Sequence, residues 1–497
     1  MEEKTKSQME MKTKEADVLL IHPPLSVNER YARDVGDVGG DLPPLGLAMV
    51  AAVLKEKGFK VRIIDSIVMH LSNKDLIEII RRNNPKVIGI TAMTPSYPRA
   101  KEIAEIIKKE FPETLLLIGG HHVTIMPEDV LKESRYDIGI IGEGELTIIE
   151  LLKLYKSMDY NYKKFLSSMK LESIDGIVFK NKKGRVILNK PRELISNLDE
   201  LPYPARELLP MSKYLPLPNQ YKRKPVVHMV AIRGCPYNCA FCSNNKLFGR
   251  GIRARSPEKV VEEIIYVMKK YNAREISFWD DMMTTSKEWV HKFCDIIIQN
   301  KIDITWTCYA RVDSVDEAML KKMKKAGCWN IFFGFESGVQ ELLDNIHKGI
   351  TLKQIEEANA LCKKYGIEVR ASFMIALPGE TPELARKTIE FAKKLNPDYV
   401  QFCITTPYPG TELYENAEKY GRLEKDFAKF SMWEPVFVPY GYRNQEEIKE
   451  IERKAMHEFY LRPEYIISRI KKINSIEDIF RYLKGLRFLL GFISNKK

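Results

Sequence analysis

Three cysteines lie close together in the segment Arg233-Gly-Cys235-Pro-Tyr-Asn-Cys239-Ala-Phe-Cys242. Thiolates with this spacing can hold three irons of a [4Fe–4S] cluster from one short loop and leave the fourth iron without a protein ligand. Such an iron can bind and reduce a small molecule, which indicates catalysis more than electron storage. Zinc is the alternative, but a structural zinc ion usually takes four protein ligands. No fourth cysteine or histidine lies in or directly beside this segment.

Charged residues follow two predicted strands further along the chain. Asp280 and Asp281 come after an apolar run, where they could bind a ligand or could cap a helix. Arg311 follows the next strand and could pair with a ligand carboxylate. It could equally form a structural pair with Asp313, two residues later. Both interpretations stay open at each position.

The elements that position these residues are strands alternating with helices. Glu336 also follows a strand, in Gly334-Phe-Glu336-Ser337-Gly338, and a buried glutamate there would need a partner. In parallel barrels, reactive groups gather at the carboxyl ends of the strands. The strands are predicted at 226–232, 275–278, 305–309, 330–335, 368–375 and 399–405.

The N-terminal region alternates in the same way. Its short apolar runs predict a parallel sheet covered by helices on both faces, with strands at 18–22, 60–65, 87–91, 115–119 and 137–141. Ligands of such sheets bind beyond the carboxyl ends of the strands. The residues there are small and rich in glycine: Thr91-Ala-Met-Thr94, Gly119-Gly-His-His-Val-Thr124 and Gly142-Glu-Gly-Glu145.

The Cys-x-x-x-Cys-x-x-Cys segment, with an aromatic residue before its last cysteine, resembles the radical S-adenosylmethionine (SAM) superfamily. The resemblance implies that Cys235, Cys239 and Cys242 hold the [4Fe–4S] cluster. It implies that the open iron chelates SAM, whose one-electron reduction releases a 5′-deoxyadenosyl radical. It further implies a partial (β/α)6 barrel. The SAM contacts that it implies are Phe241, Asp280, Asp281, Arg311, Glu336 and Ser337.

The segments Pro43-Pro-Leu-Gly46, Gly119 to Thr124 and Gly142 to Glu145 resemble the cobalamin-binding domain of cobalamin-dependent radical SAM enzymes. Small residues there would let a flat corrin ring approach the backbone. The chain lacks the Asp-x-His-x-x-Gly motif whose histidine ligates cobalt in other cobalamin proteins. This fits a cobalt without that ligand, a domain that has lost cobalamin, or one that only shares the sheet. The cobalamin contacts implied are Thr91, Gly119, Gly120, His121, Gly142 and Glu143.

The fold expected is therefore α/β: an N-terminal doubly wound parallel-sheet cobalamin-binding domain, then a partial (β/α)6 TIM-like barrel and a helical C-terminal extension. The domain boundaries expected are a polar tail at 1–15, the cobalamin domain at 16–160, a hairpin (177–188) and proline-rich linker within 161–224, the barrel at 225–423 and the extension at 424–497.

The two implied cofactors together indicate a methyltransferase that acts on an unactivated carbon. An oxidative cyclase, or an enzyme that forms carbon–carbon bonds on a porphyrin or lipid, is the alternative within the same family. A methylthiotransferase should carry three more N-terminal cysteines, and none precedes Cys235. A non-catalytic cobalamin sensor would not need the cysteine trio. A low-potential electron donor such as ferredoxin or flavodoxin is the expected partner.

The amino-acid composition indicates the class of protein, its cellular location and its partners. The 497 residues are 44% hydrophobic and 29% charged, which is typical of a soluble protein with more than one domain. Five further cysteines lie scattered in apolar runs, which favours a reducing compartment, so the expected location is the cytoplasm. The net charge of +12 is spread through Lys/Glu-rich helices, and no nucleic-acid partner is expected. The apolar and basic helix expected at 476–493 either packs on the barrel or rests on a membrane, which would suit a lipid as well as a small-molecule substrate.

Overall fold

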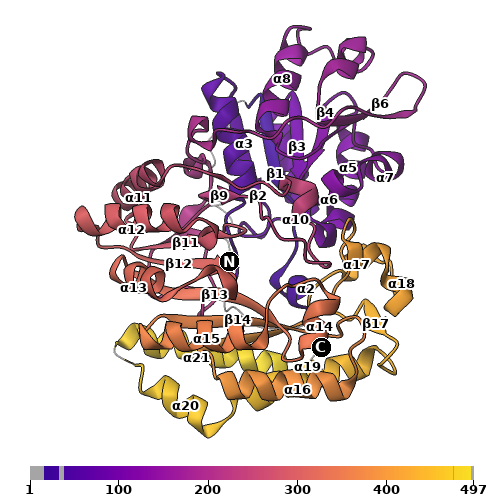
Figure 1. The fold of residues 1–497 in the computed structure, drawn as a ribbon. Helices are drawn as coiled ribbons and strands as arrows, with labels where there is room; N and C mark the ends of the chain where they lie inside the picture. Colours follow the sequence, from indigo (N-terminus) through magenta and orange to yellow (C-terminus); the bar gives the residue numbers. More distant parts are fainter. Residues whose placement is uncertain (1–15, 33–38, 474, 494–497) are drawn as a thin grey trace, which may run out of the picture. The chain divides into compact units, whose positions relative to one another are not determined.

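The computed structural model describes residues 16–32, 39–473 and 475–493, so the polar tail expected at 1–15 lies outside the described residues. The chain divides into two compact units (Figure 1). The first comprises residues up to 25 together with 44–194 and 202–211. The second comprises 26–43, 195–201 and 212–497.

The first unit contains a seven-stranded sheet in the order β2-β1-β3-β4-β5-β6-β7. Its first five strands are parallel, which confirms the predicted doubly wound sheet. Helices α3 and α8 cover one face, and α5 and α7 the other (Figure 1). The strands are β1 (Val18–His22), β2 (Val61–Asp65), β3 (Val87–Thr91), β4 (Leu115–Gly119), β5 (Ile138–Ile140), β6 (Ile177–Lys180) and β7 (Val186–Leu188).

The helices of this unit bury one apolar face each. In α5, for example, Ala100, Ile103, Ala104 and Ile107 are buried at the three- and four-residue spacing of one helix side. Ser72 and Asp75 form a capping box that starts α4. The helices are α3 (Leu45–Glu56), α4 (Asn73–Asn83), α5 (Tyr97–Glu110), α6 (His121–Ile125), α7 (Pro127–Glu133), α8 (Gly144–Lys156) and α9 (Tyr162–Leu166).

The structure assigns two segments to a different part of the fold from the one predicted from the sequence. The hairpin β6–β7, expected in the linker, extends the first sheet because β6 pairs antiparallel with β5. Residues 26–32 and 39–43, expected in the cobalamin domain, belong to the second unit. The reason is apolar packing: the ring of Tyr31 lies 5.6 Å from that of Trp433 and 5.4 Å from that of Phe488. Aromatic burial of this size outweighs proximity along the chain.

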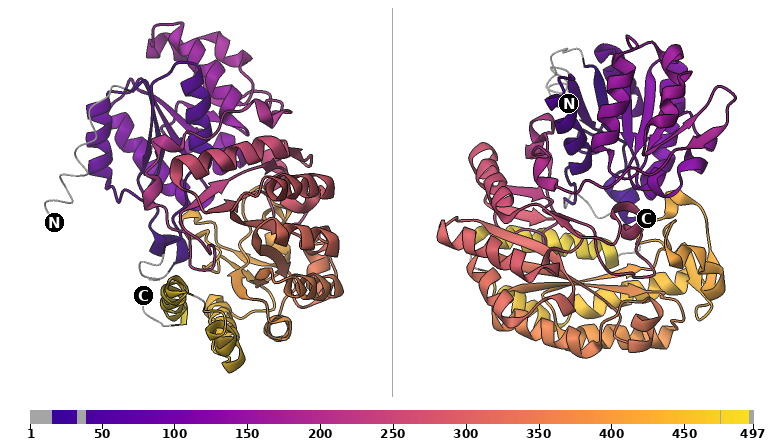
Figure 2. Two further views of the ribbon diagram at one scale, coloured as in Figure 1. Left: turned by 90° about the vertical axis from the view of Figure 1, so that its left-hand side faces the viewer. Right: turned by 45° about the horizontal axis from the view of Figure 1, so that its top comes forward.

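The second unit contains a six-stranded parallel sheet in the order β15-β14-β13-β12-β11-β8, as expected of a partial (β/α)6 barrel. Large aromatic side chains, among them Phe278, Trp306, Phe373 and Phe402, fill its core. Figure 2 shows the helices that follow the strands ranged along this sheet. The strands are β8 (Val226–Met229), β11 (Glu275–Phe278), β12 (Thr305–Ala310), β13 (Cys328–Glu336), β14 (Glu368–Ile375) and β15 (Tyr399–Ile404).

Short elements complete this unit. Two antiparallel pairs, β9 with β10 and β16 with β17, lie outside the main sheet. They are β9 (Ile232–Arg233), β10 (Arg253–Ala254), β16 (Gly421–Leu423) and β17 (Phe437–Pro439). The helices up to residue 420 are α2 (Val27–Tyr31), α10 (Asn244–Phe248), α11 (Pro257–Tyr271), α12 (Lys287–Gln299), α13 (Glu317–Lys325), α14 (Gln340–Asn345), α15 (Leu352–Lys364), α16 (Pro382–Leu395), α17 (Glu412–Glu415) and α18 (Ala417–Tyr420).

Three helices form the C-terminal extension: α19 (Gln445–Tyr460), α20 (Pro463–Ile470) and α21 (Ile476–Ile493). Helix α19 packs against β15, and α21 packs against α19. No helix among the described residues is both long and apolar enough to cross a membrane.

Candidate functional site

The three cysteines lie on the loop between β9 and α10, after the first strand of the second unit. The backbone N–H of Cys242 donates to the carbonyl of Cys239 at 3.0 Å, which gives the loop a tight turn. Ala240 ties the loop to the rest of the unit: its N–H donates to the Ile346 carbonyl (2.9 Å), and its carbonyl accepts from the N–H of Leu413 (2.8 Å). The loop is therefore held from two sides between Cys239 and Cys242.

The position directly before Cys235 accommodates only glycine, which is Gly234. Its φ is +93°, a conformation that favours glycine, and a Cβ there would lie 2.1 Å from the carbonyl oxygen of Gly251. The backbone passes close to Gly251 at this point, so any side chain would displace the start of the cysteine loop.

Asp280 and Asp281, both at the end of β11, bind the backbone that leads into the cysteine loop. One carboxylate oxygen of Asp280 accepts from the N–H groups of Ala231 (2.6 Å) and Ile232 (3.0 Å), and Asp281 accepts from Gly234 (3.0 Å). Neither residue caps α12, whose N-cap is Ser286. Burial raises the pKa of Asp280 to about 7. The bonds make these acids positioning groups, and a direct contact of either with SAM stays a prediction.

Arg311, at the end of β12, forms the structural pair with Asp313, and its contact with a ligand carboxylate stays a prediction. It forms two hydrogen bonds with the Asp313 carboxylate, each 3.0 Å long. Its remaining donors point elsewhere: Nη2 donates to the Lys348 carbonyl (2.7 Å), and Nη1 lies 3.8 Å from Cys239 Sγ. The guanidinium also lies 3.6 Å from the centre of the Tyr237 ring. The Asp313 pair thus holds a cation directly against the cysteine loop.

Glu336, at the end of β13, has the buried partner that its position requires. Lys348 Nζ donates to its carboxylate at 2.6 Å, and both side chains are buried, with 8% and 7% exposure. The backbone of Glu336 has a φ of +60°, a backbone conformation that is uncommon for residues other than glycine. The Lys348 ammonium also lies 5.7 Å from the centre of the Phe241 ring. The pair therefore lies next to the cysteine loop.

Sequence reasoning missed Lys348. It carries no motif, yet it contacts both Glu336 and Arg311 and so joins the ends of β13 and β12. The signal available was indirect: a buried glutamate needs a cation, and Lys348 is the lysine that follows Glu336 most closely in the chain.

The two remaining SAM candidates differ in their surroundings. The hydroxyl of Ser337 lies 3.1 Å from that of Thr388 on α16 and accepts from the N–H of Val339, and the residue is fully buried. Its side chain is thus already engaged with its own unit. Phe241 is partly buried and packs on a small apolar cluster that includes Leu342 and Met374. The structure brings Phe241, Arg311 and Glu336 together around the loop and leaves the Ser337 hydroxyl turned to α16.

The end of β14 carries a strained alanine and a buried acid. Ala376 has a φ of +67°, a conformation that favours glycine. Glu380 accepts from the N–H groups of Ala376 (2.8 Å) and Leu377 (3.4 Å) and from the hydroxyl of Tyr442. Burial raises the pKa of Glu380 to about 7. This acid fixes the turn after β14.

In the first unit, the cobalamin candidates lie at the carboxyl ends of the parallel strands. A Cβ on Gly119, at the end of β4, would meet nothing within 4 Å, so the backbone there is open. Gly120 differs: its φ is +99°, and a Cβ would lie 2.7 Å from the Ala92 carbonyl and 2.8 Å from the Thr91 hydroxyl. Thr91 ends β3, so the two strand ends are packed closely beside an accessible glycine.

The other candidates complete the same edge. His121 is exposed, whereas His122 turns inward and packs against Tyr97, with ring centres 4.2 Å apart. Burial lowers the pKa of His122 to about 4. Gly142 follows β5 with a φ of +71° and open space around its Cβ position. Glu143, the next residue, is buried.

The donor sets fit the implied cofactors. Three cysteine sulfurs on one loop, with a guanidinium beside Cys239, suit a thiolate-bound cluster whose charge needs compensation. No group of three or more His, Cys, Asp or Glu side chains in the described part of the chain is gathered closely enough to hold a single metal ion. Open glycines at the β4 and β5 ends suit a large flat ring that lies on the backbone.

Comparison with known proteins identifies both units. The chain matches the B12 binding domain over residues 34–152 and the radical SAM superfamily over residues 229–392. It is 38% identical to an uncharacterised methyltransferase of Pyrococcus horikoshii, over 94% of this chain and 97% of that protein. It is 31% identical to the anaerobic magnesium-protoporphyrin IX monomethyl ester cyclase of Rubrivivax gelatinosus, over 85% and 73%.

Two solved structures share the fold. The radical SAM methyltransferase TsrM of Kitasatospora setae, with cobalamin and a [4Fe–4S] cluster bound, has a TM-score of 0.65 and 17% identity and covers 88% of this chain and 85% of its own. The cobalamin-dependent SAM radical enzyme OxsB, with aqua-cobalamin and SAM bound, has a TM-score of 0.70 and 20% identity and covers 96% and 71%.

The fold and the site define a two-domain enzyme with a B12 binding domain and an iron–sulfur SAM domain. Within that class, the chain belongs to the cobalamin-binding radical SAM family, which includes methyltransferases and the monomethyl ester cyclases. The cofactors predicted from the sequence, cobalamin, a [4Fe–4S] cluster and SAM, are those of the two matched domains.

Proposed function

We propose that this enzyme transfers a methyl group to an unactivated carbon of a small molecule or lipid. The observation that carries the proposal is the presence, in one chain, of a B12 binding domain and an intact cysteine loop. The similarity to a methyltransferase along nearly the whole chain supports it. The proposed partner is a low-potential electron donor such as a ferredoxin or flavodoxin.

When bound, the cluster and cobalamin supply reductive cleavage of SAM and delivery of its methyl group. The chain's own residues position these groups. Asp280 and Asp281 fix the backbone before the cysteine loop, and Arg311 compensates negative charge at Cys239. The buried Glu336–Lys348 pair places one negative and one positive group next to Phe241, which suits the amino and carboxylate groups of SAM.

The proposed reaction uses two SAM molecules and two electrons from the donor. One SAM gives its methyl group and leaves as S-adenosylhomocysteine. The other is cleaved to methionine and a 5′-deoxyadenosyl group, which takes a hydrogen atom from the substrate carbon and leaves as 5′-deoxyadenosine. The carbon that lost hydrogen gains the methyl group, so the two nucleoside products form in equal amounts.

The test is anaerobic turnover of the reconstituted enzyme with SAM, cobalamin, a reductant and a cell extract, read by mass spectrometry. We expect S-adenosylhomocysteine and 5′-deoxyadenosine in similar amounts, together with a product heavier by one methylene. The variant Cys239→Ala should form neither nucleoside. Its control is Cys294→Ala, which removes a buried thiol on α12 and should keep both.

Oxidative cyclisation is the second candidate, favoured by the 31% identity to the cyclase of Rubrivivax gelatinosus. In that case 5′-deoxyadenosine would form without S-adenosylhomocysteine, and methylation would be refuted. A cobalamin sensor would keep its response to ligand in the Cys239→Ala variant, whereas an enzyme would lose SAM cleavage.

A further inference from the structure

The last two helices present their apolar sides outward. Ten of the 18 large apolar residues that are exposed in the described part of the chain lie between 461 and 490. This concentration is far above what scattered surface residues give. The ten are Leu461, Ile466, Ile467, Ile470, Ile476, Ile479, Phe480, Leu483, Leu486 and Leu490.

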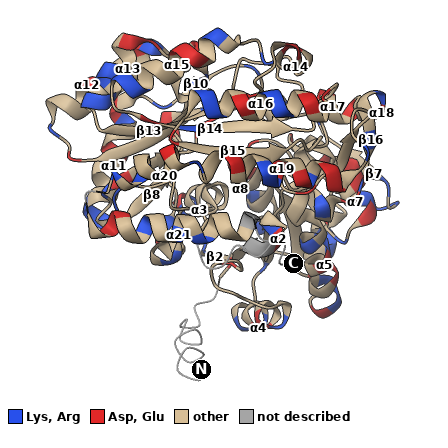
Figure 3. Cartoon of the chain, turned by 90° about the horizontal axis from the view of Figure 1, so that it is seen from below, with Lys and Arg blue, Asp and Glu red and all other residues tan. Residues whose placement is uncertain are grey.

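Helix α21 is amphipathic, but the side that it turns to the solvent is apolar. Ile476, Ile479, Phe480, Leu483 and Leu490 follow the three- and four-residue spacing of one helix side, and Ile476 and Phe480 are 73% and 64% exposed. On the opposite side, Arg481 is buried. It pairs with Asp478 at 2.9 Å and donates to the Tyr221 carbonyl at 2.7 Å. The helix thus binds its own unit through these polar bonds and through Phe488 and Leu489, and it leaves its other apolar side uncovered. In Figure 3, α21 is mostly tan, whereas α12, α13 and α16 alternate blue and red.

Helix α20 repeats this arrangement. Ile466, Ile467 and Ile470 are exposed, with Ile470 at 60%. Its inner side bonds to Asp398: the Tyr465 hydroxyl donates to the Asp398 carbonyl at 2.9 Å, and Arg469 Nη2 donates to its carboxylate at 2.7 Å. Both helices are therefore anchored on their inner side by polar contacts and by apolar packing, and their outward side is apolar.

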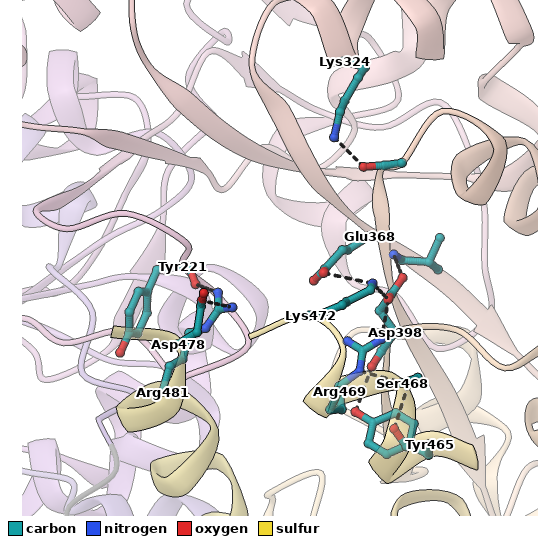
Figure 4. Close-up of polar contacts among 12 residues, drawn as sticks. Tyr221, Lys324, Glu368, Asp398, Tyr465, Ser468, Arg469, Lys472, Asp478 and Arg481 are labelled. Carbon is teal, nitrogen blue, oxygen red and sulfur yellow. Dashed lines mark hydrogen bonds and ion pairs between the residues drawn. The ribbon is translucent and has the colours of Figure 1, made fainter. Parts of the chain in front are cut away.

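The inner flank of α20 lines a cavity of about 380 Å³ at the amino ends of β13, β14 and β15. Figure 4 shows the polar contacts of several lining residues, among them Glu368, Asp398 and Lys472. Its lining is strongly basic. Five cations and two carboxylates line it: Lys222, Lys324, Lys363, Arg469 and Lys472, with Glu368 and Asp398. The volume is in the range of small-ligand pockets.

The two acids do not neutralise this charge. Asp398 accepts from Arg469, Lys472 and the N–H of Val369, and Glu368 pairs with Lys472 at 3.0 Å. Lys222 and Lys324 bind neither acid among the contacts that the described residues make. The pKa of Lys324 is lowered by burial and, secondly, by the nearby charge of Lys222. Such mutual repulsion is relieved by an anion.

We propose that α20 and α21 dock the enzyme on a bilayer that contains anionic lipids. The ten apolar residues enter the interface, and the basic cavity beside α20 takes a phosphate headgroup. Further cations lie near the apolar side chains, namely Lys471, Lys484 and Arg487. They complement an anionic surface, whereas in a symmetric contact with a second copy they would meet their own kind. This inference is independent of the reaction proposed above.

The test is flotation of the purified full-length protein with two kinds of vesicle, phosphatidylcholine alone and phosphatidylcholine with phosphatidylglycerol. We expect the parent protein to bind the anionic vesicles. Phe480→Ser with Leu483→Ser should lower binding about a hundredfold, because each large apolar side chain contributes about a tenfold factor. The control is Met169→Ser, which removes an even more exposed apolar residue (78%) from the first unit and should bind like the parent.

The cavity is tested by Lys222→Gln with Lys324→Gln. Each charge near an anionic surface contributes about a fivefold factor, so the pair should lower binding to anionic vesicles about 25-fold. The matched control is Lys163→Gln with Lys353→Gln, two lysines that are each 82% exposed. Equal binding of the apolar double variant and the parent would overturn the proposal. So would a dimer, in sedimentation velocity, that this variant abolishes, because a second copy would then cover the face.

Discussion

The carboxyl edges of the two parallel sheets are built from different kinds of residue, which suit different kinds of ligand. The edge of the first sheet is made of small residues whose backbone is open, as at Gly119 and Gly142. The edge of the second sheet is made of charged side chains held in buried contacts, as at Asp280, Arg311 and Glu336. A large flat ring needs room along the backbone, whereas a small zwitterion needs charges fixed in place.

This difference determines how each edge can be damaged. At the second edge, loss of one charge leaves its partner buried and unpaired, which destabilises the fold strongly. At the first edge, an added side chain can block a ligand without harm to the fold, provided that the backbone conformation permits it.

The largest effect is expected for Lys348→Ala. It leaves the Glu336 carboxylate buried without its cation, and removal of one partner of a buried pair costs about 3–5 kcal/mol. Thermal unfolding should shift down by many degrees, and SAM binding should be lost. The control is Lys353→Ala, which breaks an exposed pair with Glu357 (3.7 Å) and should cost less than about 0.5 kcal/mol. A stable Lys348→Ala protein would show that the pair does not support this edge.

The next effect concerns Glu380 and pH. Its pKa is about 7 in the folded protein against 4.5 ordinarily, so protonation favours the folded state. This contribution is complete below about pH 4.5 and is lost as the pH rises through about 7, at up to about 3 kcal/mol. Glu380→Gln should remove it. The melting temperature of the apoprotein, measured from acid to mildly alkaline pH, should then fall less in the variant than in the parent. Parallel curves would refute the assignment to Glu380.

Substitutions of two adjacent glycines should distinguish an effect on folding from an effect on ligand binding at the edge of the first sheet. Gly120→Ala forces a side chain into a φ of +99° and against the Ala92 carbonyl, so we expect a loss of about 2 kcal/mol or more. Gly119→Val meets open space, and we expect normal melting but weaker cobalamin binding, measured by absorbance. If Gly119→Val binds cobalamin like the parent, the corrin does not lie on this part of the edge.

The smallest effect is expected for Ala376→Gly. Ala376 has a φ of +67°, which costs an L-residue about 1–2 kcal/mol, while glycine loses about 0.5–1 kcal/mol more entropy on folding. The net gain should be about 0.5–1 kcal/mol, seen as a small rise in melting temperature. Ala371→Gly, at a buried position inside β14, is the control and should destabilise.

Much of the fold could be predicted from the sequence because buried parallel strands are short, continuous apolar runs. β1, β3, β4, β11 and β14 begin and end at the predicted residues, and α21 spans 476–493 as expected. It was harder to predict to which of the two units a segment belongs. Tyr31 joins the second unit through Trp433, about 400 positions away, and no local pattern reports such a contact.

The site could be predicted in its parts but not in its contacts. The motifs identified Glu336 and Arg311, yet not Lys348, which touches both. The strain at Ala376 could not be predicted, because it depends on a backbone angle that the sequence does not give. The outward apolar side of α21 was also hidden, because its periodicity is the same whether the apolar side faces in or out.

The most direct test is the iron and cobalamin content of the same anaerobically reconstituted samples. We expect the parent to hold both, Cys239→Ala to lose iron but keep cobalamin, and Gly119→Val to lose cobalamin but keep iron. A Cys239→Ala protein that keeps its full iron content, or one in which both cofactors are lost together in either variant, would contradict the division of labour between the two sheet edges.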